Sequence, residues 1–265
     1  MKRLIILVQI LLLISACSTV PLTGRKQLSL VSDTDVLNLS KQSFTSYMSK
    51  AKPSGNRGSN EMVDRVGRRI AGAVEAYLRA TGQAEEINNY SWEFHLIADK
   101  TPNAFCMPGG KIVVNEGILP YTKDENGLAV VLGHEIAHAV AKHANERMSQ
   151  QTLVQTGGAA LSAILSSKSE ATQNLAMTVY GLGANVGVML PYSRKHEYEA
   201  DRLGLIFSSM AGYNPEYALG FWQRMSAQSN GGSTPAFLST HPSDDARIEN
   251  LKKVIPEAKT YYRPR

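Results

Sequence analysis

The feature that most constrains this chain is the run His134-Glu135-Ile136-Ala137-His138, which has the pattern HExxH. On an α-helix, His134 and His138 lie one turn apart, so both imidazoles can reach one metal ion while Glu135 projects beside them. Zinc suits neutral imidazole ligands, and a site with three protein ligands leaves a position for water. Glu135 is placed to take a proton from that water and to deliver it to a leaving amine. The motif therefore predicts a helix at a catalytic zinc site.

The flanking sequence predicts that this helix is buried. Thr122 and Glu125 have the spacing of a capping box, so the helix is expected to begin there. The face opposite the histidines carries the apolar residues Ala129, Leu132, Ile136, Ala139 and Val140. The alternative is a pair of packed core histidines without a metal, but it would leave Glu135 as an unpaired carboxylate in an apolar helix, which is costly. We therefore favour the metal site.

A third ligand has to come from elsewhere in the chain. His143 lies about half a turn further around the predicted helix, on its opposite face, and is excluded as a ligand of the same ion. A second helix is predicted over 193–210. One narrow face of it carries Glu197, Asp201, Gly204 and Ser208. A solvated acidic stripe at a helix N-terminus would explain Glu197, but the small residues indicate a helix that is pressed close to something cationic.

These motifs resemble those of the M48 peptidases, which belong to the gluzincins. The likeness lies in the HExxH run and in Glu197-Tyr198-Glu199-Ala200-Asp201, which fits the ExEAD pattern of that family. The resemblance implies that Glu197 is the third zinc ligand beside His134 and His138. It also implies that Asp201 orients a ligand histidine and so fixes its tautomer. One zinc ion per chain is expected.

Two further stretches extend the resemblance. Asn103, Ala104 and Phe105, followed by a Pro-Gly-Gly turn, look like the edge strand of the family, which lies beside the cleft and pairs with an extended substrate. His241, followed by proline and then by Arg247, resembles a loop whose histidine faces the metal. The resemblance implies that His241 either stabilises the transition-state oxyanion or occupies the open position as a reversible fourth ligand. An ordinary loop histidine is the alternative.

The periodicity of the chain predicts a mainly helical fold with one small β-sheet, of the α+β class. Its expected centre is a gluzincin-like core, in which the HExxH helix packs beside a second helix that carries Glu197. A first helix is expected to begin at Ser32 or Asp33, and a second shows an apolar period from Met62 to Leu78. Beyond Thr122 the chain looks helical almost to its end.

Two other stretches have patterns of their own. Alternation over 90–96 predicts a half-buried strand, and the Pro-Gly-Gly within 105–115 predicts a tight strand connection after it. The segment 153–165 is rich in Ala, Gly and Leu. Its length and its glycine pair favour a closely packed internal helix or loop over a membrane segment.

The first seventeen residues predict export and attachment to a lipid. Lys2 and Arg3 precede the apolar stretch Leu4–Ile14, which is too short to span a bilayer comfortably. Cys17 follows Ile14-Ser15-Ala16, and this run resembles a bacterial lipobox. We therefore expect a lipoprotein signal peptide over 1–16, a lipidated Cys17 with a tether over 17–32, and a metallopeptidase domain over 33–265. The alternative is an ordinary signal peptide with an incidental cysteine.

Composition narrows the remaining possibilities. With 43% hydrophobic residues and a formal charge of +5, without a clustered Lys/Arg stripe, the 265 residues favour a globular enzyme and argue against a nucleic-acid partner. Cys106 is interpreted as a buried small hydrophobe rather than a reactive thiol. The sequence indicates no oligomeric state.

The expected function follows from the resemblance to the envelope-facing branch of the family. It is a zinc metalloendopeptidase that degrades misfolded or misassembled envelope proteins. A chaperone-like assembly factor with little or gated proteolysis is the alternative. Its expected partners are unfolded protein substrates and a membrane, reached through the lipid on Cys17. Its expected location is the bacterial cell envelope, at the outer membrane and facing the periplasm.

Overall fold

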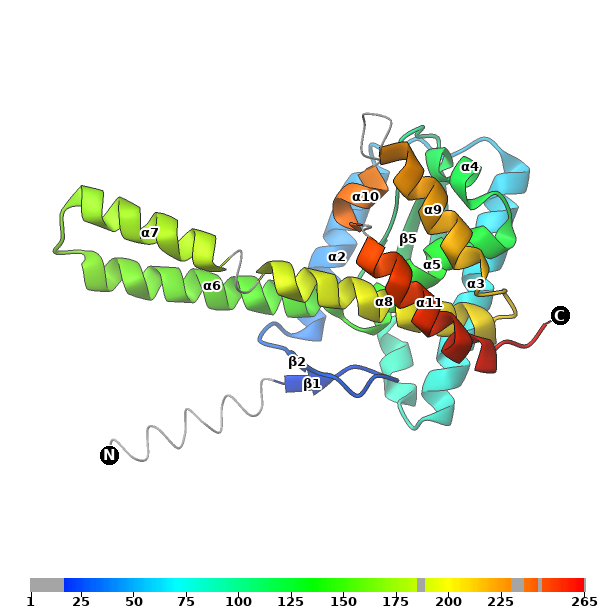
Figure 1. The fold of residues 1–265 in the computed structure, drawn as a ribbon, viewed down its shortest axis with the longest axis horizontal. Coiled ribbons are helices and arrows are strands. Elements are labelled where there is room, and N and C mark those ends of the chain that lie inside the picture. The colour runs from blue at the N-terminus through cyan, green and yellow to red at the C-terminus, as the bar shows by residue number, and fades with distance from the viewer. Residues whose placement is uncertain (1–16, 185–188, 230–235, 243–244, 265) are drawn as a thin grey trace. The chain divides into compact units, whose positions relative to one another are not determined.

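The computed structural model describes residues 17–184, 189–229, 236–242 and 245–264, so the predicted signal peptide over 1–16 lies outside the described residues. The described chain is mainly helical with small sheets, which confirms the predicted fold class (Figure 1). Its internal contacts divide it into two compact units. One runs up to Val36 and includes Lys142–His196, and the other consists of Leu37–Ala141 and Glu197–Arg265.

The larger unit is built on a sheet in which β5 (Lys111–Asn115) lies between β3 (Glu93–Ile97) and β4 (Ala104–Met107). β5 pairs parallel with β3 and antiparallel with β4. The turn between β4 and β5 contains Gly109 and Gly110, whose φ angles of 87° and 82° suit glycine, as the predicted tight connection requires. β4 is therefore an edge strand of this sheet.

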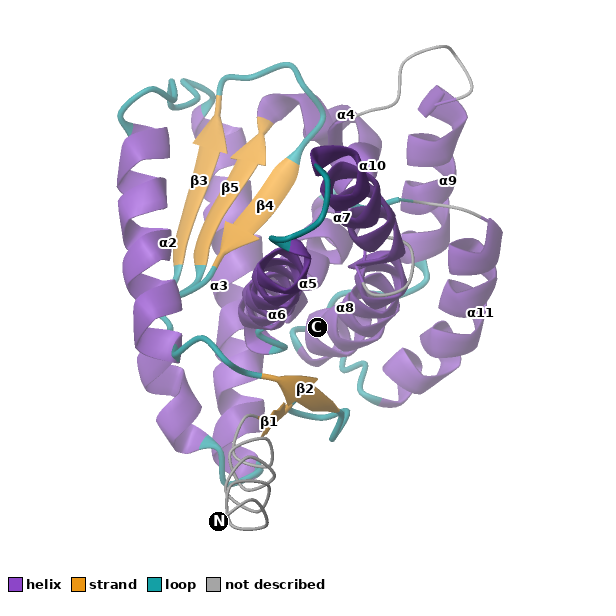
Figure 2. Ribbon diagram, turned by 90° about the vertical axis from the view of Figure 1, so that its left-hand side faces the viewer, coloured by secondary structure: helices purple, strands orange, loops and turns teal. Residues whose placement is uncertain are grey.

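Helices flank the sheet (Figure 2), whose side chains alternate between one apolar face and one mixed face that also carries Glu93, His95 and Lys111. On one face, Phe94 lies against Gly67 of α3 (Arg57–Ala80). On the other face, Tyr47 of α2 (Asp33–Met48) packs edge-on against Phe105, with 5.2 Å between the ring centroids. α5 (Glu125–Val140) contacts both α3 and β4, so the helix with the HExxH run is held against the sheet edge.

The C-terminal part of the chain packs around α5. α9 (Tyr217–Ser229) contacts α5 and α11 (Asp245–Thr260), and its Phe221 and Trp222 pack with Phe237 of α10 (Ala236–Thr240). α8 (Leu190–Met210) enters this unit at Glu197. The shorter elements of the unit are η1 (Ala84–Asn89), η2 (Glu116–Ile118) and α4 (Leu119–Thr122).

Helix starts agree with the sequence at α2 but not at α5. α2 begins at Asp33, as predicted, and the hydroxyl of Ser32 accepts a hydrogen bond from the N–H of Asp35 at 3.1 Å. α5 is capped by Asp124, whose Oδ1 accepts a bond from the N–H of Gly127 at 3.0 Å. Thr122 instead ends α4, so the predicted capping box at Thr122 is wrong: the later carboxylate supplies the cap.

The smaller unit contains a two-stranded antiparallel sheet and a helical hairpin. β1 (Cys17–Thr19) pairs with β2 (Lys26–Leu28), and β2 contacts the start of α6 (His143–Leu165). α6 and α7 (Glu170–Ala184) run antiparallel, side by side (Figure 1). In the described part of the chain, no helix combines the length and the apolarity that crossing a membrane requires.

The glycine-rich stretch of α6 is closely packed, as predicted, but it is not internal. A Cβ atom at Gly157 would lie 2.3 Å from the hydroxyl of Tyr180 on α7, and that hydroxyl donates a hydrogen bond to the carbonyl of Val154 at 2.8 Å. Beyond Gln150, however, Gly158 is the one buried residue of α6, and α7 has no buried residue. The prediction of an internal helix is therefore wrong, because the glycines serve a contact within the hairpin alone.

Candidate metal centre

Four buried side chains of the larger unit converge on one point. His134 and His138 come from α5, Glu197 comes from α8, and His241 directly follows α10. One ligand atom from each lies within 4.8 Å of the other three. The structure therefore brings together the three predicted ligands and the predicted facing histidine, and this is the one such group among the described residues.

The distances within this cluster match those between the ligands of a tetrahedral ion. His134 Nε2 lies 3.0 Å from His138 Nε2, 3.1 Å from His241 Nδ1 and 3.2 Å from Glu197 Oε2. His138 Nε2 lies 3.4 Å from Glu197 Oε1. Zinc–ligand bonds of about 2.0–2.1 Å in tetrahedral geometry place neighbouring ligand atoms about 3.3 Å apart. The residues present thus fit zinc.

The charges around the cluster also call for a cation. The carboxyl groups of Glu135, Glu197 and Asp201 are buried here, together with the guanidinium of Arg247. Burying carboxylates without compensating positive charge is costly, and one guanidinium balances one of the three. A dication at the cluster would supply the rest.

The pKa values show which groups are prepared to act as ligands. Burial raises the pKa of Glu197, but His138, His134 and His241 outweigh it and hold that pKa well below the usual range. Burial lowers the pKa of His138 to about 3, so its imidazole is neutral and its lone pair is available. Burial also lowers the pKa of His134, but bonds to Asp201 and Glu197 outweigh it and raise that pKa to about 9. His134 is thus where the carboxylates attract positive charge most strongly.

Asp201 lies behind His134, as the predicted orienting group should. Its Oδ1 is 3.0 Å from His134 Nδ1, which leaves Nε2 of the same ring directed into the cluster. Burial raises the pKa of Asp201, but Arg247 and His134 outweigh this effect and lower it. Asp201 is therefore ionised and can accept the Nδ1 proton.

Arg247 links these groups and was not among the predicted site residues. Its Nε and Nη2 each donate to a different oxygen of Asp201 at 2.8 Å, and its Nη1 lies 3.1 Å from Glu197 Oε2. The same Nη1 donates to the carbonyls of His241 and Pro242 at 3.2 and 3.0 Å. Its guanidinium carbon lies 3.7 Å from the ring centroid of Trp222. Arg247 thus holds Asp201 and the histidine loop in one arrangement.

Close contact between α5 and α8 explains why small residues follow Glu197. A Cβ atom at Gly204 would lie 2.7 Å from the backbone N of His134, and one at Gly133 would lie 2.6 Å from the carbonyl of Gly204. The hydroxyl of Ser208 donates to the carbonyl of Ala129 at 2.8 Å. The predicted face of α8 is therefore pressed against the HExxH helix.

Glu135 is fixed between the metal cluster and the sheet edge. Its Oε2 accepts a hydrogen bond from the backbone N–H of Cys106 on β4 at 3.1 Å, and its Oε1 lies 3.3 Å from His241 Nε2. Burial is the main cause that raises the pKa of Glu135. A carboxyl with a raised pKa is a better proton acceptor at neutral pH, which suits the predicted general base.

The remaining predicted residues of the edge lie at or just before β4. Ala104 is buried opposite Val114, Phe105 packs on Tyr47, and Asn103 precedes the strand. Asn103 Oδ1 is buried without a hydrogen-bond partner in the described part of the chain. Burial raises the pKa of the Cys106 thiol well above its usual range, which supports its interpretation as a small hydrophobe.

His143 is not part of the metal cluster, but the predicted reason for its exclusion is wrong. α5 ends at Val140, and Lys142, with a φ of 53°, precedes a new helix that begins at His143. His143 therefore does not lie on the opposite face of the HExxH helix. It stacks on His196 within the smaller unit, with 4.2 Å between the ring centroids.

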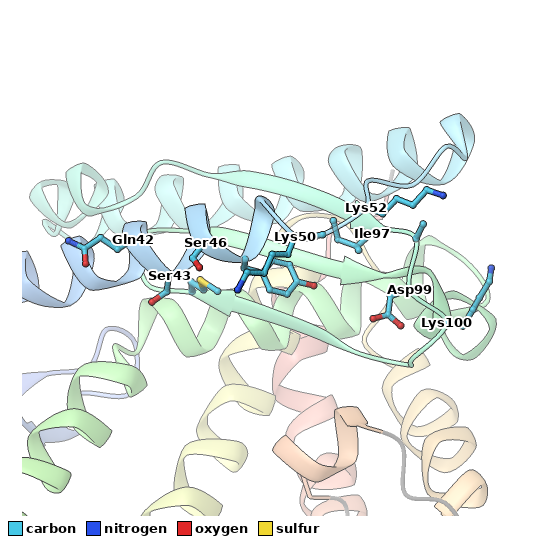
Figure 3. Close-up of a pocket in the computed structure, with 12 residues that line it drawn as sticks. Gln42, Ser43, Ser46, Lys50, Lys52, Ile97, Asp99 and Lys100 are labelled. Carbon is cyan, nitrogen blue, oxygen red and sulfur yellow. The ribbon is translucent and has the colours of Figure 1, made fainter.

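A separate groove lies on the sheet side of the larger unit (Figure 3). Its walls are the last turns of α2, Met107 of β4 and the segment after β3, and they include Lys50, Asp99 and Lys100. It contains none of the four clustered side chains, so the metal centre is a distinct site.

Comparison with known proteins gives one matching family and several relatives. The family described as "Peptidase family M48" matches residues 61–255 of this chain. The chain is 42% identical over 173 residues to "Mitochondrial metalloendopeptidase OMA1" of Schizosaccharomyces pombe, covering 65% of this chain and 49% of that protein. It is 30% identical over 247 residues to "Metalloendopeptidase OMA1, mitochondrial" of Homo sapiens, covering 90% and 46%.

A bacterial relative matches as well. The chain is 30% identical over 174 residues to "Beta-barrel assembly-enhancing protease" of Yersinia pestis, covering 64% of this chain and 36% of that protein. The chain thus spans about half the length, or less, of these relatives.

These relatives contradict the predicted location. The yeast and human proteins, which match at equal or higher identity than the bacterial one, are named as mitochondrial. The expectation of a bacterial envelope protein at the outer membrane, facing the periplasm, is therefore wrong. The prediction depended on the lipobox-like run and on the envelope-facing members of the family, and neither distinguishes such a protein from these relatives.

Proposed function

The chain belongs to peptidase family M48, and on that premise we propose that it is an endopeptidase that cuts extended segments of unfolded or misassembled proteins. The predicted enzyme class, a zinc metalloendopeptidase, is confirmed by the family and by relatives named as metalloendopeptidases. The predicted cofactor, zinc, is confirmed with it, and the cluster of His134, His138, Glu197 and His241 could hold one ion.

One hydrogen bond carries the proposal for the substrate. β4 pairs with β5 through one of its edges, and the N–H of Cys106 on the other edge points at Glu135. The unpaired edge of β4 therefore faces the metal centre. An extended chain that adds to this edge as a further strand would place its backbone beside Glu135. Because such pairing uses backbone groups, it requires an unfolded segment rather than a particular side chain.

Asn103 supports the same arrangement. Its Oδ1 is buried and has no hydrogen-bond partner among the described residues, although a buried carbonyl oxygen normally has one. It lies one residue before β4, where an incoming strand would offer backbone N–H groups. We propose that Asn103 accepts one of them.

The reaction divides between the ion and the side chains. When bound, zinc supplies Lewis-acid activation of water and of the scissile carbonyl. Glu135 Oε1 accepts the proton of the attacking water and later passes it to the leaving amine. Asp201 holds the tautomer of His134, and Arg247 holds Asp201. The N–H of Cys106 keeps the carboxylate of Glu135 directed at the cluster.

His241 is proposed to regulate access to the ion. Its Nδ1 lies 3.0 Å from Glu197 Oε2 and 3.1 Å from His134 Nε2. These distances are those between ligands of one ion, whereas a side chain that binds only the oxyanion would lie further from the other ligands. This observation favours a reversible fourth ligand, and with it the second candidate function, an assembly factor with gated proteolysis. Displacement of the His241 side chain would open the position for water.

Cleavage of an unfolded protein such as casein by the whole chain tests these proposals. Glu135→Gln should abolish cleavage while it retains zinc, because the amide cannot accept the proton. Glu61→Gln, a carboxylate-to-amide change on the exposed surface of α3, is the matched control and should cleave like the wild type. Equal cleavage by Glu135→Gln and wild type would reject the mechanism. Faster cleavage by His241→Ala would support a gate, whereas a large loss would assign His241 to the transition state.

The lipid on Cys17 stays a proposal that the sequence alone supports. Cys17 is the first residue of β1, directly after the apolar N-terminal stretch. Mass spectrometry of the N-terminal peptide from membranes would show the added mass of acyl chains on Cys17. An unmodified N-terminal peptide that includes residues before Cys17 would contradict it.

A further inference from the structure

The hairpin of α6 and α7 exposes most of the large apolar side chains that this chain leaves in contact with solvent. Nine such side chains are exposed among the described residues, and six of them belong to the hairpin. They are Leu153, Ile164, Leu175, Met177, Val179 and Leu182. Ile164 is 74% exposed and Leu175 67%. A concentration of this kind usually marks a surface that meets a partner.

The hairpin also lacks the charges that cover an exposed helix in water. Of the 46 residues in 148–193, only Lys168 and Glu170 are charged, whereas 19% of the whole chain is. Both lie at or beside the turn that joins the two helices. α3, by comparison, carries eight charged residues in 24 and pairs several of them along its exposed face. The exposed face of α3, which lies in water, thus carries charged side chains that the hairpin lacks.

The exposed apolar groups of α7 form one stripe, and uncharged polar side chains occupy much of the remaining surface of the hairpin. Leu175, Val179 and Leu182 recur at i, i+4 and i+7, which places them on one side of α7. Thr, Ser, Gln and Asn occupy many of the other exposed positions of both helices. A surface with an apolar stripe and an uncharged polar remainder fits the boundary of a lipid bilayer, which is apolar on its inner side and polar on its outer side.

The start of the hairpin is bonded to the N-terminal arm within the same unit. Arg25, after β1, forms two bonds to Glu146 of α6, at 3.0 and 2.8 Å. The N–H groups of Leu30 and Val31 donate to the hydroxyl of Ser149 at 2.9 and 3.3 Å. The arm continues directly from Leu4–Ile14, the apolar stretch of the sequence. The described part of the arm and the hairpin therefore belong to one compact unit.

We propose that the α6–α7 hairpin docks into the interface of a lipid bilayer. The exposed leucine, isoleucine and valine side chains would enter the acyl-chain boundary, and the uncharged polar side chains would remain among the headgroups. The scarcity of charge from residue 148 to the end of α7 suits side chains that enter the acyl-chain boundary, since charged groups are costly there. The proposal concerns the hairpin alone and does not depend on the proposed peptidase mechanism.

Quenching of introduced tryptophans by brominated lipid tests it in the whole chain. Ile164→Trp and Leu175→Trp place probes on the two helices, and Leu39→Trp on α2 is the matched control, an exposed leucine outside the hairpin. All three variants have the same N-terminus, so any binding through that segment affects them equally. With vesicles of brominated phosphatidylcholine, the emission added at 164 and 175 should shift to the blue and be quenched, while that added at 39 should not.

Other outcomes would overturn the proposal. If the chain binds the vesicles but the probes at 164 and 175 are quenched no more than the probe at 39, the hairpin does not enter the bilayer. If the hairpin probes shift to the blue without vesicles, in proportion to protein concentration, the hairpin packs against a second copy instead. Replacing Leu175 and Leu182 by lysine should abolish quenching at 164 with unchanged helical content and zinc content, and retained quenching would contradict the role of these side chains.

Discussion

The metal centre and the α6–α7 hairpin depart from the usual distribution of side chains in opposite directions. The centre buries carboxylates and imidazoles, which normally face water, and the hairpin exposes leucines and valines, which normally avoid it. Each arrangement is costly for the chain alone. In both, the missing stabilisation would come from something the chain does not itself supply: a dication in one region and, on our proposal, a lipid surface in the other.

The two regions should therefore respond differently to substitution. In the metal centre each group is constrained by several neighbours, so small changes should be damaging to both the fold and the zinc site. Along the exposed part of the hairpin, stability of the free protein should depend little on the side chain. Substitutions that probe this difference should have their largest effect where the two helices of the metal centre touch.

The contact between α5 and α8 should be the most sensitive point. Gly204→Ala would place a Cβ atom 2.7 Å from the backbone of His134, so the helices must separate and Glu197 must move away from the histidines. We expect a loss of about 1–3 kcal/mol or more in the free energy of unfolding, together with loss of bound zinc. Chemical denaturation and metal analysis measure both.

A glycine with free space around it is the control for that substitution. Gly72 on α3 has no atom within 4 Å of its virtual Cβ, so Gly72→Ala should be neutral or stabilise by up to about 1 kcal/mol. If Gly204→Ala retained zinc and stability as well as Gly72→Ala does, the contact between the helices would not define the site.

Arg247 should come next, because it acts on the ligands through Asp201. Arg247→Lys keeps the charge but cannot bond both oxygens of Asp201 at once, so His134 loses its fixed orientation. We expect zinc affinity to fall about 10- to 100-fold, as for other groups that orient a ligand. Competition with a chromophoric chelator measures the affinity without reference to activity.

The matched control for Arg247 is an arginine in a surface ion pair. Arg65 pairs with Glu125 on the exposed side of α3, and Arg65→Lys should leave zinc affinity unchanged. An equal effect of the two substitutions on zinc affinity would show that Arg247 contributes only general stability.

Local pattern was sufficient to predict the parts of the site that lie on single helices. The HExxH run and the face of Glu197, Asp201 and Gly204 are periodic features, and helix geometry alone places their members together. The strand over 90–96 and the glycine turn before β5 were predictable for the same reason. The sequence could also indicate close packing at Gly204, since small residues below an acidic pair on one helix face favour a tight contact with a neighbouring helix.

Other features depend on contacts that no local pattern carries. Arg247 bonds to Asp201 across 46 positions of sequence, and its stacking on Trp222 depends on the packing of α9. Asp124 rather than Thr122 caps α5, because Thr122 ends the preceding helix α4 and its hydroxyl donates to the carbonyl of Leu119. The hairpin was predicted to be internal because an apolar, glycine-rich pattern shows what a helix contains but not what surrounds it.

The smallest expected effect concerns Glu146, a buried carboxylate at the start of the hairpin. Unlike the carboxylates of the metal centre, it is neutralised by side chains of the protein itself. Its partners are Arg25 and His196, with His196 Nε2 at 2.8 Å. Burial raises the pKa of Glu146, but the bonds from His196 and Arg25 outweigh it and lower that pKa to about 2. The ionised form thus stabilises the folded state above about pH 4.5, and this contribution is lost as the pH falls toward 2.

Glu146→Gln should therefore cost about 1–2 kcal/mol at pH 7, with the difference from wild type shrinking as the pH is lowered from 5 toward 2. Urea unfolding at several pH values measures it, and Glu61→Gln in the exposed pair with Arg57 should differ from wild type by less than about 0.5 kcal/mol throughout. A difference at Glu146 that does not change with pH would contradict the lowered pKa. Hydrogen exchange gives a second measurement. If Glu146→Gln left the arm and the hairpin as protected as in wild type, the buried ion pairs of Glu146 would contribute little to the stability of this unit.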